Sequence, residues 1–336
     1  MRSAVHVRAA LVAAFLVAAA SVFFPPFTIP PARGESAAER YYRVGDWPKA
    51  AAAYEEVVRQ GAGPEDLVKA AEADYRAGRL ERAALLANRV LEKDDSVEAR
   101  IILALIKARR GSPREALRDV ESLKRTPADD HKVYTAIGVI VRAEDAPRAL
   151  EYFRKAVDLN PDDFWAWFNM GLVYEDREVF EQATRAYKNA VRINPLYAQA
   201  QNNLGYSYKE RRFYAYAVEH YRKAIELLPD NPGFYYNIGN AYSHQEKIDE
   251  AFNAYRKALE LDPAFAKAHY NMARMYLRKD MVSEAIEEFR LYLRYGSSEV
   301  FGYVAPRAAV ETEIKELETY LEIYGEVKPA GGSMAR

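Results

Sequence analysis

Hydrophobic residues recur along most of the chain at the three- and four-residue spacing of one helix face, and this pattern itself repeats. Four segments align without a gap at a spacing of 34 residues, namely Phe164 to Tyr197, Ala198 to Asn231, Pro232 to Phe265 and Ala266 to Glu299. With each segment numbered from 1 to 34, positions 4, 7, 8 and 11 share one face of a first helix, and positions 20, 24 and 27 share one face of a second. The pattern predicts an all-α chain of stacked helix pairs, because no single pair buries its apolar face alone.

Small residues, aromatic rings and proline hold fixed places in this register. Positions 8 and 20 carry the small residues Gly171, Gly205, Gly239, Ala273, Ala183, Ala217, Ala251 and Ala285. Positions 11 and 24 carry the aromatic residues Tyr174, Tyr208, Tyr242, Tyr276, Tyr187, Tyr221, Tyr255 and Phe289. Position 32 carries Pro195, Pro229, Pro263 and Ser297. We expect the small residues to let two backbones approach, the aromatic rings to fill the space toward the next pair, and proline to end the second helix because it lacks an amide hydrogen.

The first half of the chain carries the same register in a weaker form. The segment from His131 to Asp163 keeps a glycine, an aromatic residue and a proline at their places, with one residue deleted between its helices. Three further units are expected in residues 97–130, 64–96 and 37–63, which makes about eight units. We therefore divide the repeats into degenerate units over residues 37–130 and well-formed units over residues 131–299.

The repeat stops after Glu299, and a different helix is expected beyond it. Pro306 suits the first turn of a helix. One apolar stripe follows and consists of Val310, Ile314, Leu317, Leu321 and Tyr324. Residues 300–324 are predicted to form a C-terminal capping helix, since a solenoid needs a terminal element with one polar face, and residues 325–336 are predicted to be a disordered tail.

The recurring positions resemble those of the tetratricopeptide repeat family, over about Ala37 to Glu299 and most strongly in the second half. The resemblance implies a right-handed α-solenoid whose first helices line an inner, concave surface, with positions 2, 5, 6, 9, 12 and 13 facing it. It also implies that the chain holds other polypeptides and does not catalyse a reaction.

One polar residue recurs as regularly as the apolar ones. Position 6 is asparagine in all four well-formed segments, which places Asn169, Asn203, Asn237 and Asn271 in a series. If these amides face the groove, as the resemblance implies, each offers two donors and one acceptor to the backbone of an extended peptide. We then expect them to face solvent in the free protein. The alternative is that these amides only bond between neighbouring helices, and the sequence leaves the two readings open.

The same surface is expected to carry further binding residues around the asparagine series. These candidate groove residues are Trp165, Phe168, Asn202, Tyr206, Tyr236, Asn240, Tyr270 and Arg274. Aromatic side chains with polar tips favour binding surfaces, although a chain with 25 tyrosines scatters them widely. The last unit is locally basic, which favours an acidic ligand segment. The carboxylate clamp of the family is incomplete here, because only Asn237 and Lys267 match it, so we do not expect binding of chaperone C-termini.

The composition and the absence of known motifs exclude several classes of function. The chain has 48 basic and 49 acidic residues, so its formal net charge of −1 gives no general attraction to nucleic acid. It has no cysteine, which excludes disulfides, thiolate catalysis and cysteine-ligated metals. We find no phosphate-binding loop, nucleophile elbow or dinucleotide motif, and the five histidines do not pair at metal-ligand spacing on one helix. We expect no enzyme activity, no cofactor and no metal.

The N-terminus has the pattern of a targeting segment. Arg2, His6 and Arg8 precede an uncharged run from Ala9 to Ala32. We interpret residues 1–32 as a signal peptide or a membrane anchor with a proline-rich spacer, and a buried helix that caps the solenoid is the alternative. Either targeting reading puts the repeats outside the cytoplasmic membrane, in the periplasm, with membrane contact only through this segment.

These observations lead to one main functional hypothesis and two alternatives. The main one is a non-catalytic scaffold that binds a protein or an extended peptide in its concave groove. The alternatives are a homo-oligomer that assembles through convex tyrosines or the capping helix, and an accessory subunit of a cell-envelope complex. The sequence does not name the partner or the pathway.

Overall fold

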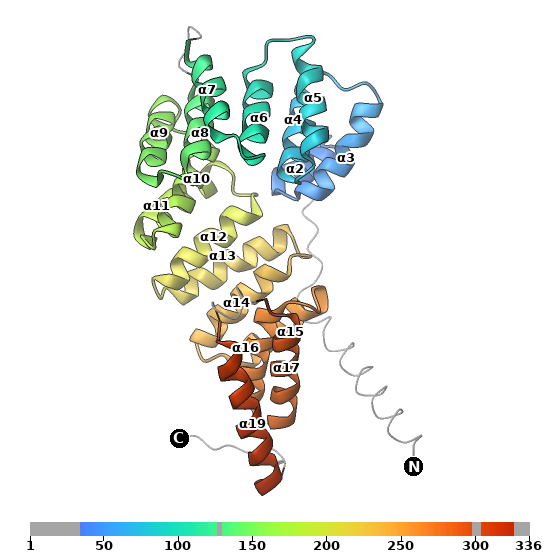
Figure 1. The fold of residues 1–336 in the computed structure, drawn as a ribbon, viewed down its shortest axis with the longest axis vertical. Coiled ribbons are helices and arrows are strands. Elements are labelled where there is room, and N and C mark those ends of the chain that lie inside the picture. The colour runs from blue at the N-terminus through green and yellow to red at the C-terminus, as the bar shows by residue number, and fades with distance from the viewer. Residues whose placement is uncertain (1–33, 126–129, 298–303, 326–336) are drawn as a thin grey trace.

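The computed structural model describes residues 34–125, 130–297 and 304–325. Over these residues the protein has 17 α-helices, one short 3-10 helix (Leu123–Arg125) and no β-strand. Figure 1 shows the helices following one another in chain order, with α2 to α11 in the upper part and α12 to α19 descending to the bottom. The all-α solenoid predicted from the repeat is confirmed.

Sixteen of the helices form eight consecutive pairs, and the last helix packs on the final pair. The pairs are α2 (Ala37–Val44) with α3 (Trp47–Arg59), α4 (Pro64–Arg76) with α5 (Leu80–Leu91), α6 (Val97–Arg109) with α7 (Pro113–Ser122), α8 (His131–Val141) with α9 (Ala146–Leu159), α10 (Phe164–Asp176) with α11 (Phe180–Ile193), α12 (Ala198–Glu210) with α13 (Tyr214–Leu227), α14 (Pro232–His244) with α15 (Ile248–Leu261), and α16 (Ala266–Leu277) with α17 (Val282–Tyr295). The final helix is α19 (Arg307–Tyr324).

Each well-formed pair closes where a small residue of its first helix meets an aromatic ring of its second. A Cβ atom on Gly171 would lie only 2.3 Å from the ring of Tyr187, and one on Gly239 only 2.7 Å from the ring of Tyr255. Both rings are almost completely buried. The expectation that these rings fill the space between pairs was therefore wrong in part. In these two pairs the ring lies on the glycine of its own pair, at a distance that leaves no room for a Cβ atom.

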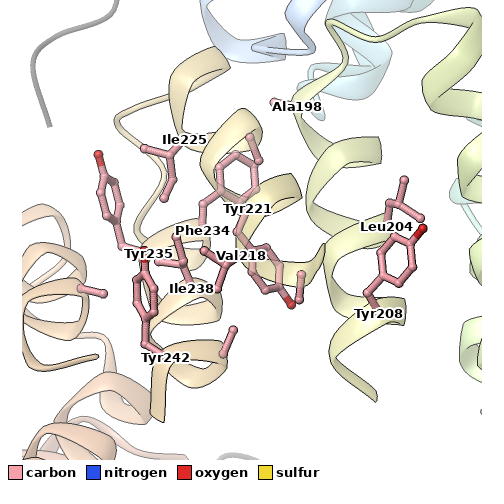
Figure 2. Packing of buried hydrophobic residues seen from close by; sticks show 14 of the residues in the cluster. Ala198, Leu204, Tyr208, Val218, Tyr221, Ile225, Phe234, Tyr235, Ile238 and Tyr242 are labelled. Atoms are coloured by element: carbon pink, nitrogen blue, oxygen red, sulfur yellow. The ribbon is translucent and has the colours of Figure 1, made fainter. Parts of the chain in front are cut away.

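Apolar side chains of each second helix pack against the first helix of the next pair. Figure 2 shows Val218 and Tyr221 of α13 beside Phe234 and Ile238 of α14, and all four belong to one buried cluster. Fully burying one such side chain contributes about 1.5–3 kcal/mol to folding. These contacts join the pairs into one continuous core without a central domain.

The turn inside each pair has a common backbone geometry. Position 15 of the four well-formed pairs is left-handed although none of these residues is glycine; they are Glu178, Arg212, Glu246 and Asp280, with φ of 57°, 62°, 60° and 57°. The same turn in the first three pairs uses Gly45, Gly78 and Gly111, with φ of 79°, 82° and 90°. The degenerate units therefore keep the turn geometry of the well-formed ones. The turn between α8 and α9, where one residue is deleted, contains no left-handed residue.

Proline ends the second helices as expected. Helices α11, α13 and α15 have Asn194, Leu228 and Asp262 as their C-caps, and the next residues are Pro195, Pro229 and Pro263. Since proline has no amide hydrogen and clashes within a helix, it prevents another turn. The three prolines thus set where each following pair begins.

The capping helix α19 packs on α17 with most of the predicted stripe. Val310 and Ile314 are buried, and Leu317 and Leu321 lie partly buried against the same cluster. Tyr324 is 69% exposed, so its place in the buried stripe was wrong. Helix α19 has 18 residues whereas α17 has 14, and the last turn of α19 finds little to pack against.

Several predictions concern residues outside the described ranges. The targeting segment over residues 1–32, the start of the capping segment at residues 300–303 and the tail beyond residue 325 lie there. Within the described ranges, none of the helices combines the length and the apolar composition needed to cross a membrane.

Candidate functional site

Three successive first helices carry polar and aromatic residues at positions 5, 6 and 9. We call these nine residues the groove row: Asn202, Asn203 and Tyr206 on α12, Tyr236, Asn237 and Asn240 on α14, and Tyr270, Asn271 and Arg274 on α16. Hydrogen bonds between neighbouring helices connect the members of the row. The row therefore brings together nine of the twelve residues that the sequence predicted for the groove.

The amides of α12 and α14 bind one another. Asn203 donates through Nδ2 to the hydroxyl of Tyr187 at 3.3 Å, and its Oδ1 accepts from Gln199 at 2.7 Å and from Asn202 at 3.2 Å. Asn237 donates across the interface to Oδ1 of Asn202 at 2.9 Å. These bonds link three successive repeats through side chains alone.

A second amide group joins α14, α15 and α16. The hydroxyl of Tyr255 donates to Oδ1 of Asn240 at 2.7 Å. The Nδ2 of Asn271 donates to the same Oδ1 at 2.7 Å and to the Tyr255 hydroxyl at 3.4 Å. Every member of this group is half-buried or buried, so the network is held between helices and away from bulk water.

The expectation that the asparagine series faces solvent was wrong. Asn203 is only 6% exposed, and Asn237 and Asn271 are half-buried with donors engaged by neighbouring repeats. Asn169 is half-buried and donates to the carbonyl oxygen of Trp165 on its own helix at 2.8 Å. The reason is that closely packed first helices leave buried polar atoms that need partners, and the amides supply them.

Trp165 and Phe168 were predicted to line the groove, but they belong to a group of rings that packs against the first two pairs of the chain. The guanidinium of Arg76, at the end of α4, lies 3.4 Å from the ring centroid of Trp165. Trp47, at the start of α3, lies 6.3 Å from Trp165 between ring centroids, and Tyr197 lies 6.1 Å from Trp47. Phe168 is buried in the same group of rings, 5.5 Å from Tyr197. We call this group the aromatic clasp: Trp47, Arg76, Phe164, Trp165, Phe168 and Tyr197.

Backbone contacts support the clasp. A Cβ atom on Gly45 would lie 2.4 Å from the ring of Tyr197, so the turn between α2 and α3 touches this ring directly. Asn194 donates to the carbonyl oxygen of Arg43 at 3.5 Å. The first pair therefore covers the inner face at α10, and the groove row on α12, α14 and α16 remains as the candidate site.

Sequence reasoning missed the clasp residues on the first two pairs. Trp47 and Arg76 belong to degenerate units, where the register is weak, and Trp165 lies 118 and 89 residues further along the chain. One signal in the sequence was Trp47, because the well-formed units have no tryptophan at the start of their second helices. The repeat pattern carries no information about contacts between distant units.

The tyrosines at position 24 differ in their hydrogen bonds. Tyr187 donates to a carboxylate oxygen of Glu175 at 2.8 Å, and Tyr255 donates to Asn240. The hydroxyl of Tyr221 is buried and has no partner among the described residues. Asn203 donates to the Tyr187 hydroxyl and Asn271 to the Tyr255 hydroxyl, so Asn237 would be the corresponding donor to Tyr221. Asn237 donates to Asn202 instead.

Two titratable groups in this region have shifted pKa values. Burial raises the pKa of Glu175 to about 6, against the hydrogen bond from Tyr187, which lowers it. Burial also lowers the pKa of His220 to about 4, where the ring stacks on Tyr208 and its Nδ1 lies 2.9 Å from Oε1 of Gln201. Both groups lie inside the repeat packing, so these shifts report burial and give no sign of acid–base chemistry.

His244 and His269 make separate structural contacts. His244 stacks on Tyr214 at 5.0 Å, whereas the two ring nitrogens of His269 lie near Glu288 and the carbonyl oxygen of Pro263. In the part of the chain that the structure describes, no group of three or more histidine or acidic residues could hold a metal ion.

Comparison with known proteins agrees with the repeat. A family profile described as TPR repeat matches residues 214–245 and 239–280, and one described as Tetratricopeptide repeat matches residues 152–183. The crystal structure of YrrB, described as a TPR protein with an unusual peptide-binding site, is 20% identical, covers 59% of this chain and 97% of its own, and has a TM-score of 0.50. A search of curated proteins finds no significant match.

Solved structures of MamA proteins are also similar. One MamA crystal structure is 24% identical, covers 49% of this chain and 91% of its own, and has a TM-score of 0.47. MamA from Desulfovibrio magneticus RS-1 is 23% identical, covers 50% of this chain and 96% of its own, and has a TM-score of 0.48. The family profiles therefore match tetratricopeptide repeats within residues 152–183 and 214–280, and the other described helix pairs continue the same arrangement.

Proposed function

We propose that this protein is a non-catalytic scaffold that binds a partner polypeptide along the groove row. The observation that carries the proposal is that α12, α14 and α16 each present a half-buried tyrosine, namely Tyr206, Tyr236 and Tyr270, beside amides already fixed by their neighbours. Tyrosine offers a large apolar face and a polar tip with little conformational entropy to lose, which suits a binding surface. The similarity to YrrB, described as a TPR protein with an unusual peptide-binding site, supports the same class of partner.

The asparagine series has a different role in this proposal from the one first expected. Its amides hold the three helices in register, and the tyrosines beside them make the contact with the partner. A peptide carbonyl can still accept a hydrogen bond from Nδ2 of Asn240, whose Oδ1 already accepts two, but backbone recognition by a continuous amide ladder is not part of the proposal.

Co-purification with groove variants tests this function. The tagged full chain and a Tyr206→Ala/Tyr236→Ala variant would be isolated from the native cell, together with a Tyr216→Ala control. Tyr216 is 56% exposed on the second helix α13, away from the row. We expect the groove variant to lose its partner while the control keeps it, with melting curves to confirm that both fold.

Self-assembly is the second candidate, and exposed apolar residues favour it. Phe213 and Tyr216 on or next to α13 are 46% and 56% exposed, and Ile323 and Tyr324 on α19 are 65% and 69% exposed. If the partner is a second copy of this chain, light scattering would give at least twice the monomer mass, and Tyr216→Ala or Tyr324→Ala would reduce it. A monomer at all concentrations would exclude this candidate.

We also propose that the protein acts outside the cytoplasmic membrane, because a basic start is followed by an uncharged run in residues 1–32. A C-terminal reporter that is active only after export should be active in the native host. A silent export reporter with an active cytoplasmic one would contradict the proposal.

A further inference from the structure

A cavity of about 470 Å³ opens at the C-terminal end of the groove row, between α14 and α16. Its floor is formed by Tyr255 and Asn271, and its walls include Arg274, Arg278 and the apolar side chains of Met275 and Leu277. The cavity is therefore part polar, part apolar and lined by two cations.

The floor of this cavity is fixed. The hydroxyl of Tyr255 donates to Oδ1 of Asn240. The Nδ2 of Asn271 donates both to Oδ1 of Asn240 and to the Tyr255 hydroxyl. Because these donors are engaged by the protein, they cannot be the main attraction for a ligand. The attraction must come from the charged walls.

The two arginines are one helical turn apart on one face of α16, but their partners differ. Arg274 donates to the Tyr270 hydroxyl at 3.0 Å and to a carboxylate oxygen of Glu313 on α19 at 2.6 Å. Arg278 makes no ion pair or side-chain hydrogen bond within the described ranges. Glu313 thus demonstrates that a carboxylate fits this rim, and Arg278 offers the equivalent place one turn further on.

The charge of Arg278 reaches the cavity. Burial raises the pKa of Tyr255, and Arg278 is among the groups that oppose this rise. Arg278 itself is exposed, so its guanidinium is open to a ligand, and it can hold a carboxylate through two parallel charge-assisted hydrogen bonds. The apolar side chains of Met275 and Leu277 suit the methylene groups that carry such a carboxylate.

We propose that this cavity binds a carboxylate of the polypeptide that lies in the groove, with Arg278 as its main partner. The proposal rests on the proposed function, because it assigns a ligand chemistry to one end of the same site. The carboxylate comes from a glutamate or aspartate side chain or from the C-terminus of the ligand. In both forms it carries a negative charge at neutral pH and accepts two hydrogen bonds from one guanidinium.

Three labelled peptides of one length separate the possibilities. The first has both ends blocked and contains paired glutamates between alanine and tyrosine residues. The second replaces the glutamates with glutamines, and the third is the glutamine peptide with a free C-terminus. Fluorescence anisotropy at low salt would measure the affinity of the full chain for each. We expect the glutamate peptide, the free-ended peptide or both to bind about tenfold more tightly than the blocked glutamine peptide, as is typical for one charge-assisted bond.

Arg278→Gln should remove this preference, and Lys279→Gln is the matched control. Lys279 is the adjacent residue, but it pairs with Asp249 and does not line the cavity. Melting temperatures would confirm that both variants fold, as expected for substitutions of an exposed residue and a surface ion pair.

The outcomes distinguish this proposal from the proposed function. Equal affinity for all three peptides, or a preference that survives Arg278→Gln, would overturn the carboxylate site. If the native partner is still lost with Tyr206→Ala/Tyr236→Ala, the groove function stands even though the carboxylate site has failed. A preference that Lys279→Gln removes as strongly as Arg278→Gln would mean that general surface charge attracts the peptide, which also overturns the site.

Discussion

Three tyrosines occupy position 24 of successive second helices, and their hydroxyl groups meet different surroundings. Tyr187 and Tyr255 donate to Glu175 and Asn240, whereas the buried hydroxyl of Tyr221 has no partner among the described residues. A buried hydroxyl without a partner destabilises the folded state, while removal of a paired one leaves its acceptor unsatisfied.

The three tyrosines therefore respond differently to removal of the hydroxyl. We expect Tyr255→Phe to lower the free energy of unfolding by about 1–3 kcal/mol and Tyr221→Phe to leave it unchanged or raise it slightly. Urea unfolding followed by circular dichroism would measure both. Equal losses for the two variants would show that Tyr221 has a partner in solution.

The raised pKa of Glu175 makes the stability of the folded protein depend on pH. Its pKa rises to about 6 in the folded protein from 4.5, so the folded state holds the proton more tightly. The stability of the wild type should therefore fall as pH rises from about 4.5 to about 6, and Glu175→Gln should remove this fall. At pH 7 the variant should be more stable than the wild type by at most about 2 kcal/mol, and at pH 4 the difference should be close to zero. A difference that does not change with pH would contradict the shifted pKa.

The close approach at Gly171 is sensitive to a single methyl group. A Cβ atom there would lie 2.3 Å from the buried Tyr187 ring, which Glu175 and Asn203 also hold in place. We expect Gly171→Ala to destabilise the protein by about 1–3 kcal/mol through overpacking. Gly233→Ala is the control, because its nearest neighbour is a flexible oxygen of Asn231 at 3.2 Å. Thermal melts of the two variants should differ clearly, and similar melting temperatures would mean that the Tyr187 ring can move.

At the scale of the helix pair, the asparagines join neighbouring repeats. Asn203 makes three side-chain hydrogen bonds, and Asn237 bridges α14 to α12. The Asn203→Ala/Asn237→Ala variant removes four hydrogen bonds and should lose about 2–6 kcal/mol of stability at a net 0.5–1.5 kcal/mol per bond. Asn169→Ala should lose less, since its amide binds only its own helix.

The same double variant also tests whether these amides bind the partner directly. For this test, the affinity of the folded variant for its partner would be measured. Unchanged affinity together with a lower melting temperature would limit them to holding the helices in register. If the double variant loses more affinity than Asn169→Ala, the hypothesis that the asparagine series binds the peptide directly would be supported again.

The sequence predicted much of this element-level structure because the repeat is local. The glycine at position 8, the aromatic at position 24 and the proline at position 32 each act within one pair or on the next, so their spacing is enough to place the helices. The orientation of the asparagines was not predictable, because an amide at position 6 satisfies its hydrogen bonds equally well in water or against a neighbour. The choice depends on Asn202, which occupies a position that is aromatic in the other three well-formed units.

At the scale of the whole molecule, the aromatic clasp ties the first pair to the middle of the solenoid. A solenoid repeat normally contacts only its neighbours, so a pattern of neighbours contains no sign of this contact. Arg76 is the central cation, 3.4 Å from the Trp165 ring and 5.1 Å from the Trp47 ring. Its partly buried cation–π contacts contribute about 1–2 kcal/mol, enough to hold two rigid parts of one chain together.

Removal of this cation should loosen the first pair. We expect Arg76→Ala to increase the radius of gyration in small-angle X-ray scattering and to raise amide hydrogen exchange in α2 and α3. Arg109→Ala is the control, since Arg109 also ends a first helix and stacks on Tyr75 but makes no clasp contact. An unchanged radius and unchanged exchange in Arg76→Ala would show that the other contacts of the first pair hold it without this cation.

The clasp also affects how the chain is made. Trp47 leaves the ribosome well before Trp165 and Tyr197, which lie more than a hundred residues further along. At a synthesis rate of about 5–20 residues per second, the first pair waits several seconds to tens of seconds without its partners. During that interval its tryptophan is exposed to solvent and to any chaperone present. The first pair is therefore the earliest part of the repeat array to be synthesised, but its contacts are completed only after the fifth pair, α10 with α11, has been made.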